Sequence, residues 1–153
     1  MKTIFRLLFI FLFAFIYMGC KRKCKNKDAC NYDEKEECVL KPSGTVSTNM
    51  ESGNGYTWPC FGNSRLGFSG LNFVSDGGCL GVGEIADMGS MTCVGGVTTK
   101  PASGYGNPVA AEIGHGYVFK SQDGIYARFY AEEWMKNTSG GVIGIKISYQ
   151  SPF

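Results

Sequence analysis

Hydrophobic and polar residues alternate most regularly near the end of the chain. Across residues 142–150, three isoleucines and a tyrosine take every second position, with glycine or polar residues between them. This period of two residues is typical of a β-strand with one buried face. Two aromatic runs at 117–120 and 125–130 flank Asp123-Gly124, a pair that favours a tight hairpin. The pattern predicts an antiparallel three-stranded meander over residues 116–150.

Shorter apolar runs precede this segment and are separated by glycine. All but one of the 22 glycines follow residue 38, and the aromatic and β-branched residues between them indicate short strands joined by tight turns. The runs 66–74, 91–98 and 108–113 predict further strands, and residues 84–88 predict a single helical turn. We therefore expect residues 39–153 to form an all-β domain, either a small antiparallel β-sandwich or a barrel-like fold.

The N-terminal residues have the pattern of an export signal. Lys2 and Arg6 precede an apolar run from residue 7 to 18, and Gly19 follows. A transmembrane helix needs about 20 apolar residues, so the shorter run indicates a cleavable signal peptide over residues 1–19.

The residues at the end of this run resemble a lipobox. Tyr17-Met18-Gly19-Cys20 is similar to the looser lipoboxes of the Bacteroidota, although Tyr17 and Met18 replace the usual leucine and small residue. The resemblance implies a lipid on Cys20 that anchors the protein to a membrane of the cell envelope. The outer membrane is the expected one, with the domain on its periplasmic or exposed side.

Charge excludes one class of partner. Removing Lys2 and Arg6 with the signal leaves 13 basic residues against 13 acidic ones, so no overall positive field would attract nucleic acid. Basic residues cluster only over 21–27, beside Cys20. That cluster would either contact anionic lipid headgroups or form a solvated tether.

Six cysteines remain besides Cys20, and an even number in an exported chain indicates disulfides. A zinc site is the alternative, but the usual spacing of two cysteines separated by two residues is absent. The spacing does not choose among the possible pairings. The candidates are Cys24, Cys30, Cys38, Cys60, Cys79 and Cys93.

Two segments resemble known sequences. Ala29-Cys30-Asn31-Tyr32 is similar to a short cysteine-rich repeat of secreted Bacteroidota proteins, which implies that residues 20–38 form a disulfide-linked tether. The acids at 33–37 could instead bind calcium, but this segment lacks the glycine at which a calcium loop bends. The C-terminal residues, from Gly114-His115-Gly116-Tyr117-Val118 to Tyr149-Gln150-Ser151-Pro152-Phe153, resemble the ending of a Bacteroidota lipoprotein group. That resemblance implies a tethered β-domain and carries no catalytic residue.

Two motifs suggest chemistry only weakly. Residues 81–86 have the spacing G-x-G-x-x-A of a dinucleotide loop, but no strand–helix–strand unit surrounds them. His115 is the only histidine, so multi-histidine metal sites are excluded, and catalysis would need an acid and a hydroxyl beside it in a pocket. Haem ligation by His115 with Met88 or Met91 is a further hypothesis, because the hairpin has a loose similarity to haem-binding lipoproteins. We therefore predict no catalytic residue, no metal site and no cofactor.

Aromatic residues are the most suggestive feature of the last third. In a regular strand Tyr126, Tyr130 and Trp134 share one face, while Ala127 and Phe129 share the other. An exposed aromatic stripe would bind a glycan or a protein of an envelope complex. The alternative is that these rings form a second core layer.

The sequence thus leaves three hypotheses for function. The first is a non-enzymatic binding or accessory lipoprotein, and the second is a structural spacer or adhesin-like module without a small ligand. The third is an enzyme, for which no set of catalytic residues is visible. An exposed aromatic face would favour the first over the second.

Overall fold

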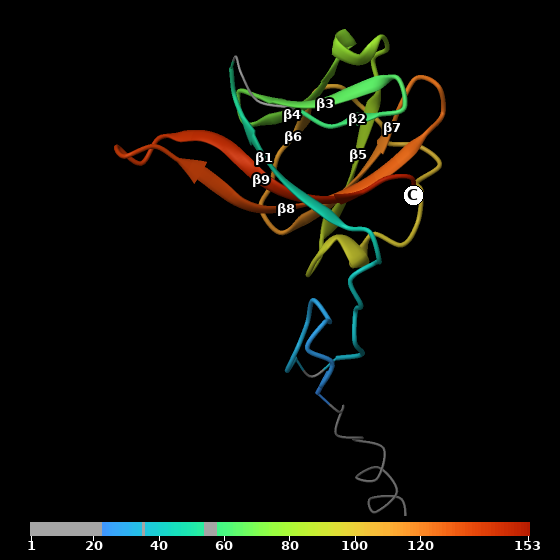
Figure 1. The fold of residues 1–153 in the computed structure, drawn as a ribbon, viewed down its shortest axis with the longest axis vertical. Helices are drawn as coiled ribbons and strands as arrows, with labels where there is room; N and C mark the ends of the chain where they lie inside the picture. The colour runs from blue at the N-terminus through green and yellow to red at the C-terminus, as the bar shows by residue number, and fades with distance from the viewer. Residues whose placement is uncertain (1–22, 35, 54–57) are drawn as a thin grey trace, which may run out of the picture.

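The protein is a sandwich of two antiparallel sheets (Figure 1). The computed structural model describes residues 23–34, 36–53 and 58–153, so the predicted signal peptide and Cys20 lie outside the described residues. The five-stranded sheet has the order β1 (Val46–Glu51), β9 (Val142–Gln150), β8 (Tyr126–Lys136), β7 (His115–Lys120) and β5 (Glu84–Ser90). The four-stranded sheet has the order β2 (Cys60–Phe61), β3 (Ser64–Ser69), β4 (Asn72–Asp76) and β6 (Val109–Ala110). The all-β prediction is confirmed.

The C-terminal meander has the predicted form. β7, β8 and β9 pair in sequence order, with Phe129 opposite both Tyr117 and Tyr149. Asp123-Gly124 turns the chain between β7 and β8, and Gly124 has a φ of 82°, a conformation that glycine adopts without strain. β1 then pairs with β9, although about 100 residues separate them along the chain.

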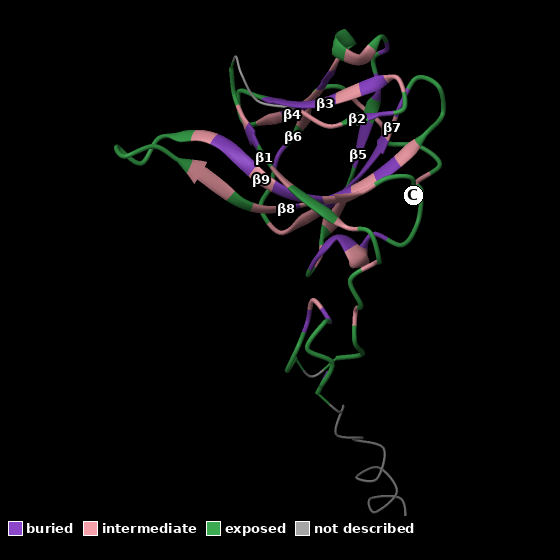
Figure 2. Ribbon diagram, in the orientation of Figure 1, coloured by how far each residue is buried: buried purple, intermediate pink, exposed green. Residues whose placement is uncertain are grey.

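The core lies between the two sheets and is largely aromatic. Phe73 from the four-stranded sheet packs edge-on against Phe129, with ring centroids 4.8 Å apart, and against Tyr117 at 4.9 Å. Such edge-to-face contacts stabilise aromatic pairs beyond the area they bury. In Figure 2 the buried residues follow the strands of both sheets. The members of this core include Met50, Phe61, Leu66, Phe68, Ile85, Phe119, Ala127, Ala131, Ile145 and Ile147.

Several shorter elements differ from those predicted. Residues 66–74 form parts of two strands, because Gly70 and Leu71 both have a positive φ and turn β3 into β4. Only Val109 and Ala110 of the 108–113 run are in a strand. Residues 84–88 belong to β5 and not to a helical turn, because pairing with β7 buries Ile85 opposite Phe119 and overrides a local helical preference.

The predicted strand at 91–98 is also wrong. This segment is a loop around a short 3-10 turn, η2 (Val94–Gly96), and it buries Val94 and Val97 against the outer face of the five-stranded sheet. The segment is apolar because it covers a sheet, and its Gly95 lies where a side chain would collide with the carbonyl of Leu40. An apolar run that packs as a loop has the same composition as a buried strand.

The six cysteines of the described chain form three disulfides, as predicted. Cys24 pairs with Cys38 within the N-terminal cysteine-rich module, and Cys60 pairs with Cys79 beside the four-stranded sheet. The third disulfide joins Cys30 of the module to Cys93, across 63 residues. The module is therefore cross-linked to the domain beneath the five-stranded sheet (Figure 1).

The hydrogen bonds of Asn31 explain why the cysteine-rich motif has asparagine at this position. Its side chain is buried, and its amide nitrogen donates to the carbonyl of Glu37 at 2.8 Å. Its Oδ1 accepts from the backbone N–H of Val39 at 2.8 Å. The Asn31 side chain thus holds the start of the 31–39 loop to two backbone groups at its end.

Candidate ligand-binding cleft

A polar row crosses the outer face of the five-stranded sheet. Tyr130 on β8 lies opposite Ser148 on β9, and Ser148 lies opposite Ser47 on β1. Directly opposed residues of neighbouring strands project to the same side of a sheet. Their neighbours along the strands, Phe129 and Ile147, point into the core instead. The row therefore presents one phenol ring and two hydroxyls away from the core.

A β-bulge in β8 adds an acid to this face. The pairing with β9 shifts between Ala131 and Glu133, so that β8 contains one extra residue there. Glu132 and Glu133 both reach Lys146 on the outer face, at 3.1 and 3.4 Å. The bulge turns Trp134 to the inner face, where it lies opposite Ile145 and packs against Phe68 of the other sheet.

The bulge corrects the predicted aromatic stripe. Tyr126 and Tyr130 lie on the outer face, but Trp134 packs against the core, so the three rings do not share one surface. Lys100 places its ammonium 4.7 Å from the centre of the Tyr126 ring. Of the three predicted ligand-binding residues, Tyr130 alone lines the cleft described below.

Two segments cover the outer face beside the row. Loop 91–98 is held by Arg128, whose Nη1 donates to the carbonyl of Val97 at 2.6 Å and whose Nε and Nη2 donate to Gln150. Burial lowers the pKa of this guanidinium. The disulfide between Cys30 and Cys93 then fixes the cysteine-rich module to the same loop. Module and loop together form a wall over the polar row.

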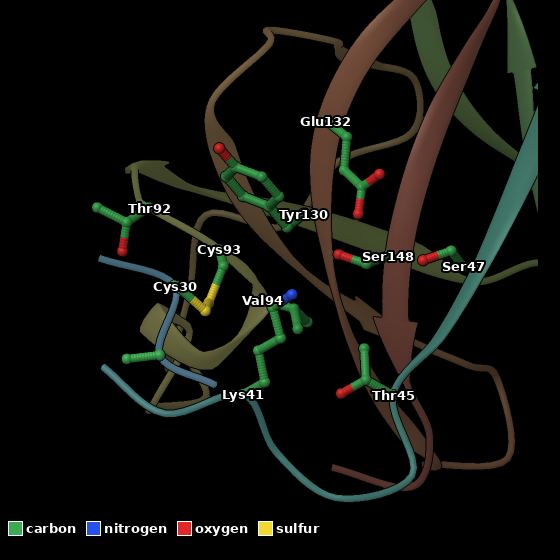
Figure 3. Close-up of a pocket in the computed structure, with 11 residues that line it drawn as sticks. Cys30, Lys41, Thr45, Ser47, Thr92, Cys93, Val94, Tyr130, Glu132 and Ser148 are labelled. Carbon is green, nitrogen blue, oxygen red and sulfur yellow. A yellow bond between two sulfur atoms is a disulfide. The ribbon is translucent and has the colours of Figure 1, made fainter. Parts of the chain in front are cut away.

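A cleft of about 370 Å³ lies between this wall and the sheet (Figure 3). Its floor is Tyr130, Glu132, Ser148 and Ser47, and in Figure 3 the side chains of the first two extend from β8. Burial, followed by the charge of Glu132, raises the pKa of the Tyr130 phenol, so this hydroxyl stays neutral and can donate. The remaining lining residues are Ala29, Cys30, Lys41, Thr45, Thr92, Cys93 and Val94.

The chemistry of the cleft is that of a site for a neutral polar ligand. It offers four hydroxyls from serine and threonine, one carboxylate, one ammonium and one phenol ring. The ammonium and the carboxylate offset each other, and hydroxyls both donate and accept hydrogen bonds. Small-molecule sites range from about 300 to 1,000 Å³. The volume of the cleft falls within this range.

A second cavity of about 470 Å³ lies near the G-x-G-x-x-A motif. Gly83 and Glu84 line it, and the N–H of Gly83 donates to the hydroxyl of Ser75 at 2.7 Å. Strand β5 begins within the motif, at Glu84, so the motif lacks the helix N-terminus that would bind a pyrophosphate. The motif is a turn into β5, and no aromatic ring of the described residues lines this cavity.

His115 lies beside an acid and a hydroxyl, as an enzyme would require. Its Nδ1 is 3.0 Å from Asp87, and its Nε2 is 3.4 Å from the hydroxyl of Ser90. However, a carboxylate oxygen of Glu112 is 3.3 Å from the same Nε2. A histidine base must keep this nitrogen free to accept the proton of the nucleophile, and here Glu112 shares the position beside it with Ser90. Neither cleft described above includes His115.

The structure also shows where the methionines proposed as haem ligands lie. Met91 packs against Gly116, on the opposite face of β7 from His115, and Met88 alternates with Asp87 along β5. The haem pair proposed from the sequence is therefore not brought together.

In the cysteine-rich module Asp33 binds Lys23 at 2.8 Å and Lys25 at 3.0 Å, and these contacts lower the pKa of its carboxyl. A calcium ion would have to displace both lysines.

No family model, curated protein or solved structure matches this chain. No helix among the described residues is long and apolar enough to cross a bilayer.

Proposed function

We propose that the protein is a lipid-anchored, non-enzymatic binding protein of the bacterial cell envelope and that it binds a saccharide in the cleft. The observation that carries this proposal is the placement of Tyr130 in the cleft beside Glu132 and Ser148. A phenol ring binds the apolar face of a sugar, while the carboxylate and hydroxyls bind its edge. A purely structural spacer needs no such cleft, so its presence supports a binding function.

The proposed anchor would place the cleft close to the membrane. Cys20 precedes Cys24 by four residues, which span at most about 14 Å when extended. Cys24 belongs to the module that forms one wall of the cleft. A lipid on Cys20 would therefore hold the module at the membrane surface and direct the four-stranded sheet away from it. The resemblance to Bacteroidota lipoproteins supports this arrangement.

A glycan array tests the binding function. The full-length chain, purified in detergent, is applied beside the Tyr130→Ala variant. We expect the wild-type protein to retain one class of saccharide and the variant to lose at least about tenfold in affinity, because ring stacking contributes about 0.5–1.5 kcal/mol and further hydrogen bonds depend on it. Equal retention by both proteins, or none by either, would refute the proposal.

Metabolic labelling with a fatty-acid probe tests the anchor. The wild-type chain should incorporate the probe, and Cys20→Ser should not, because this thiol is the acceptor that the lipobox resemblance implies. Cys24→Ser is the control, and it should still be labelled. Labelling of Cys20→Ser would show that the anchor is not at this cysteine.

A further inference from the structure

Four polar residues from three segments meet at the open end of the sandwich. His115 begins β7, Asp87 and Ser90 belong to the edge strand β5, and Glu112 precedes β7 in a short turn. On β7, His115 shares the inward face with Tyr117 and Phe119, which are buried in the core. The group therefore lies at the edge of the core, beside the segment that connects β6 of one sheet to β7 of the other.

A second β-bulge brings the β5 residues to His115. Asp87 lies opposite Tyr117, but the register shifts after it, so that Ser90 lies opposite His115. Gly89 has a φ of 78° within the bulge, and its N–H donates to Asp87 at 2.8 Å. Bulges of this kind redirect side chains towards sites. Without the extra residue, a glycine would face His115.

Backbone and core contacts also fix Glu112. The Tyr117 hydroxyl accepts from the backbone N–H of Glu112 at 2.8 Å, and the N–H of His115 donates to the Glu112 carbonyl at 3.3 Å. Gly114 in this turn donates to the carbonyl of Ala131 on β8 at 2.9 Å. The turn is thus attached to two strands, and the Glu112 and His115 side chains start from fixed backbone positions.

The two ring nitrogens of His115 have different surroundings. Nδ1 is within 3.0 and 3.1 Å of the two Asp87 carboxylate oxygens, so a proton on Nδ1 is donated to Asp87. In the neutral tautomer with its proton on Nδ1, the lone pair is on Nε2, which faces Glu112 at 3.3 Å and Ser90 at 3.4 Å. Metal-binding histidines have this arrangement, in which a carboxylate holds the nitrogen that does not bind the ion.

We propose that this group binds a divalent cation of the zinc class. The ligands are Nε2 of His115 and a carboxylate oxygen of Glu112, Asp87 is the positioning residue, and water or the Ser90 hydroxyl completes the shell. Two ligands about 2.0–2.1 Å from a tetrahedral ion lie about 3.3 Å apart, which is the separation found between His115 and Glu112. An imidazole ligand favours zinc and similar ions over calcium and magnesium.

Competing metal ligands are few in the described part of the chain. Its six cysteines are all in disulfides, and Asp87, Glu112 and His115 form the one group of three metal-binding side chains found there. The side chain of His115 is 20% exposed and that of Glu112 is 59% exposed, so an ion can enter without unfolding the sandwich. This site is distinct from the saccharide cleft and does not depend on it.

Calorimetric titration with zinc chloride tests the proposal, using the full-length chain purified in detergent without a histidine tag. We expect one ion per chain, no binding by His115→Gln, and binding about 10–100-fold weaker for Asp87→Asn, because the positioning carboxylate is lost. Glu133→Gln, an exposed acid elsewhere, should bind like the wild type, and so should Tyr130→Ala in the saccharide cleft.

Nuclear magnetic resonance gives a second readout, because the chain has a single histidine and hence a single set of imidazole signals. Zinc should shift these signals in the wild-type protein at one equivalent, and the effect should be weaker in Asp87→Asn. Unchanged imidazole signals, no heat up to millimolar zinc, or equal affinity of His115→Gln would each overturn the proposal.

Discussion

Trp134 of β8 lies opposite Ile145 of β9 on the inner side of the five-stranded sheet, although a regular strand would place it on the outer side with Tyr130. The bulge at Ala131 to Glu133 causes this change of face. It has two results. The indole ring of Trp134 packs against Phe68, and two successive glutamates lie on the outer face, with Glu132 in the floor of the cleft and Glu133 exposed.

Ile145→Ala tests the inner face of β9. Ile145 is fully buried, so its truncation should lower the free energy of unfolding by about 2–5 kcal/mol, which is a large part of the stability of a small domain. Lys146→Ala is the control on the outer face, and it should cost less than about 1 kcal/mol because its ion pairs are solvent-exposed. Chemical denaturation measures both. A larger effect at Lys146 would mean that the register of β9 is wrong.

Replacing Cys30 and Cys93 together by serine should detach the module from loop 91–98. The disulfide closes a span of 63 residues, and its removal should lower the free energy of unfolding by about 3–4 kcal/mol through the entropy of the unfolded chain. Limited proteolysis, followed by a non-reducing gel, gives the second measurement. A cut in the linker at residues 41–44 should release the module from the double variant and leave it attached in the wild type. Equal release from both would contradict the cross-link.

The buried phenol of Tyr117 should lower the free energy of unfolding at high pH. Burial raises the pKa of its phenol from about 10 to about 12, so the folded state keeps the proton where the unfolded state releases it. Its contribution is therefore complete below pH 10 and is lost as the pH rises towards 12, by about 2–3 kcal/mol in total. Denaturation between pH 8 and 12 measures this slope. Tyr117→Phe should show a shallower slope than the wild type, and identical slopes would exclude this origin.

The regular parts of the fold are predictable from local sequence. The alternation of Ile143, Ile145 and Ile147 and the Asp123-Gly124 turn identify the meander, because each depends only on residues close in the chain. The pairing of β1 with β9 joins segments about 100 residues apart, and no local signal marks it. The even cysteine count predicts disulfides, but their pairing depends on the same long-range contacts.

The candidate sites are less predictable, because both depend on bulges. The bulge near Asp87 brings Ser90 opposite His115, and the bulge near Glu132 moves Trp134 to the core. One extra residue reverses the face of every residue after it, and its position depends on the partner strand. The sequence therefore identifies Tyr130 as an outer-face residue but assigns Trp134 to the wrong face. It also misses Asp87 and Glu112, which lie 28 and 3 residues from His115.

Calorimetric titration of the saccharide retained on the array tests the central claim most directly. Wild-type protein, Tyr130→Ala and Tyr126→Ala are compared, since both tyrosines lie on the outer face of β8 but Tyr130 alone lines the cleft. We predict one saccharide per wild-type chain, a loss of at least about tenfold in affinity for Tyr130→Ala, and wild-type affinity for Tyr126→Ala. Equal losses in the two variants, or a loss at Tyr126 alone, would contradict binding in the cleft.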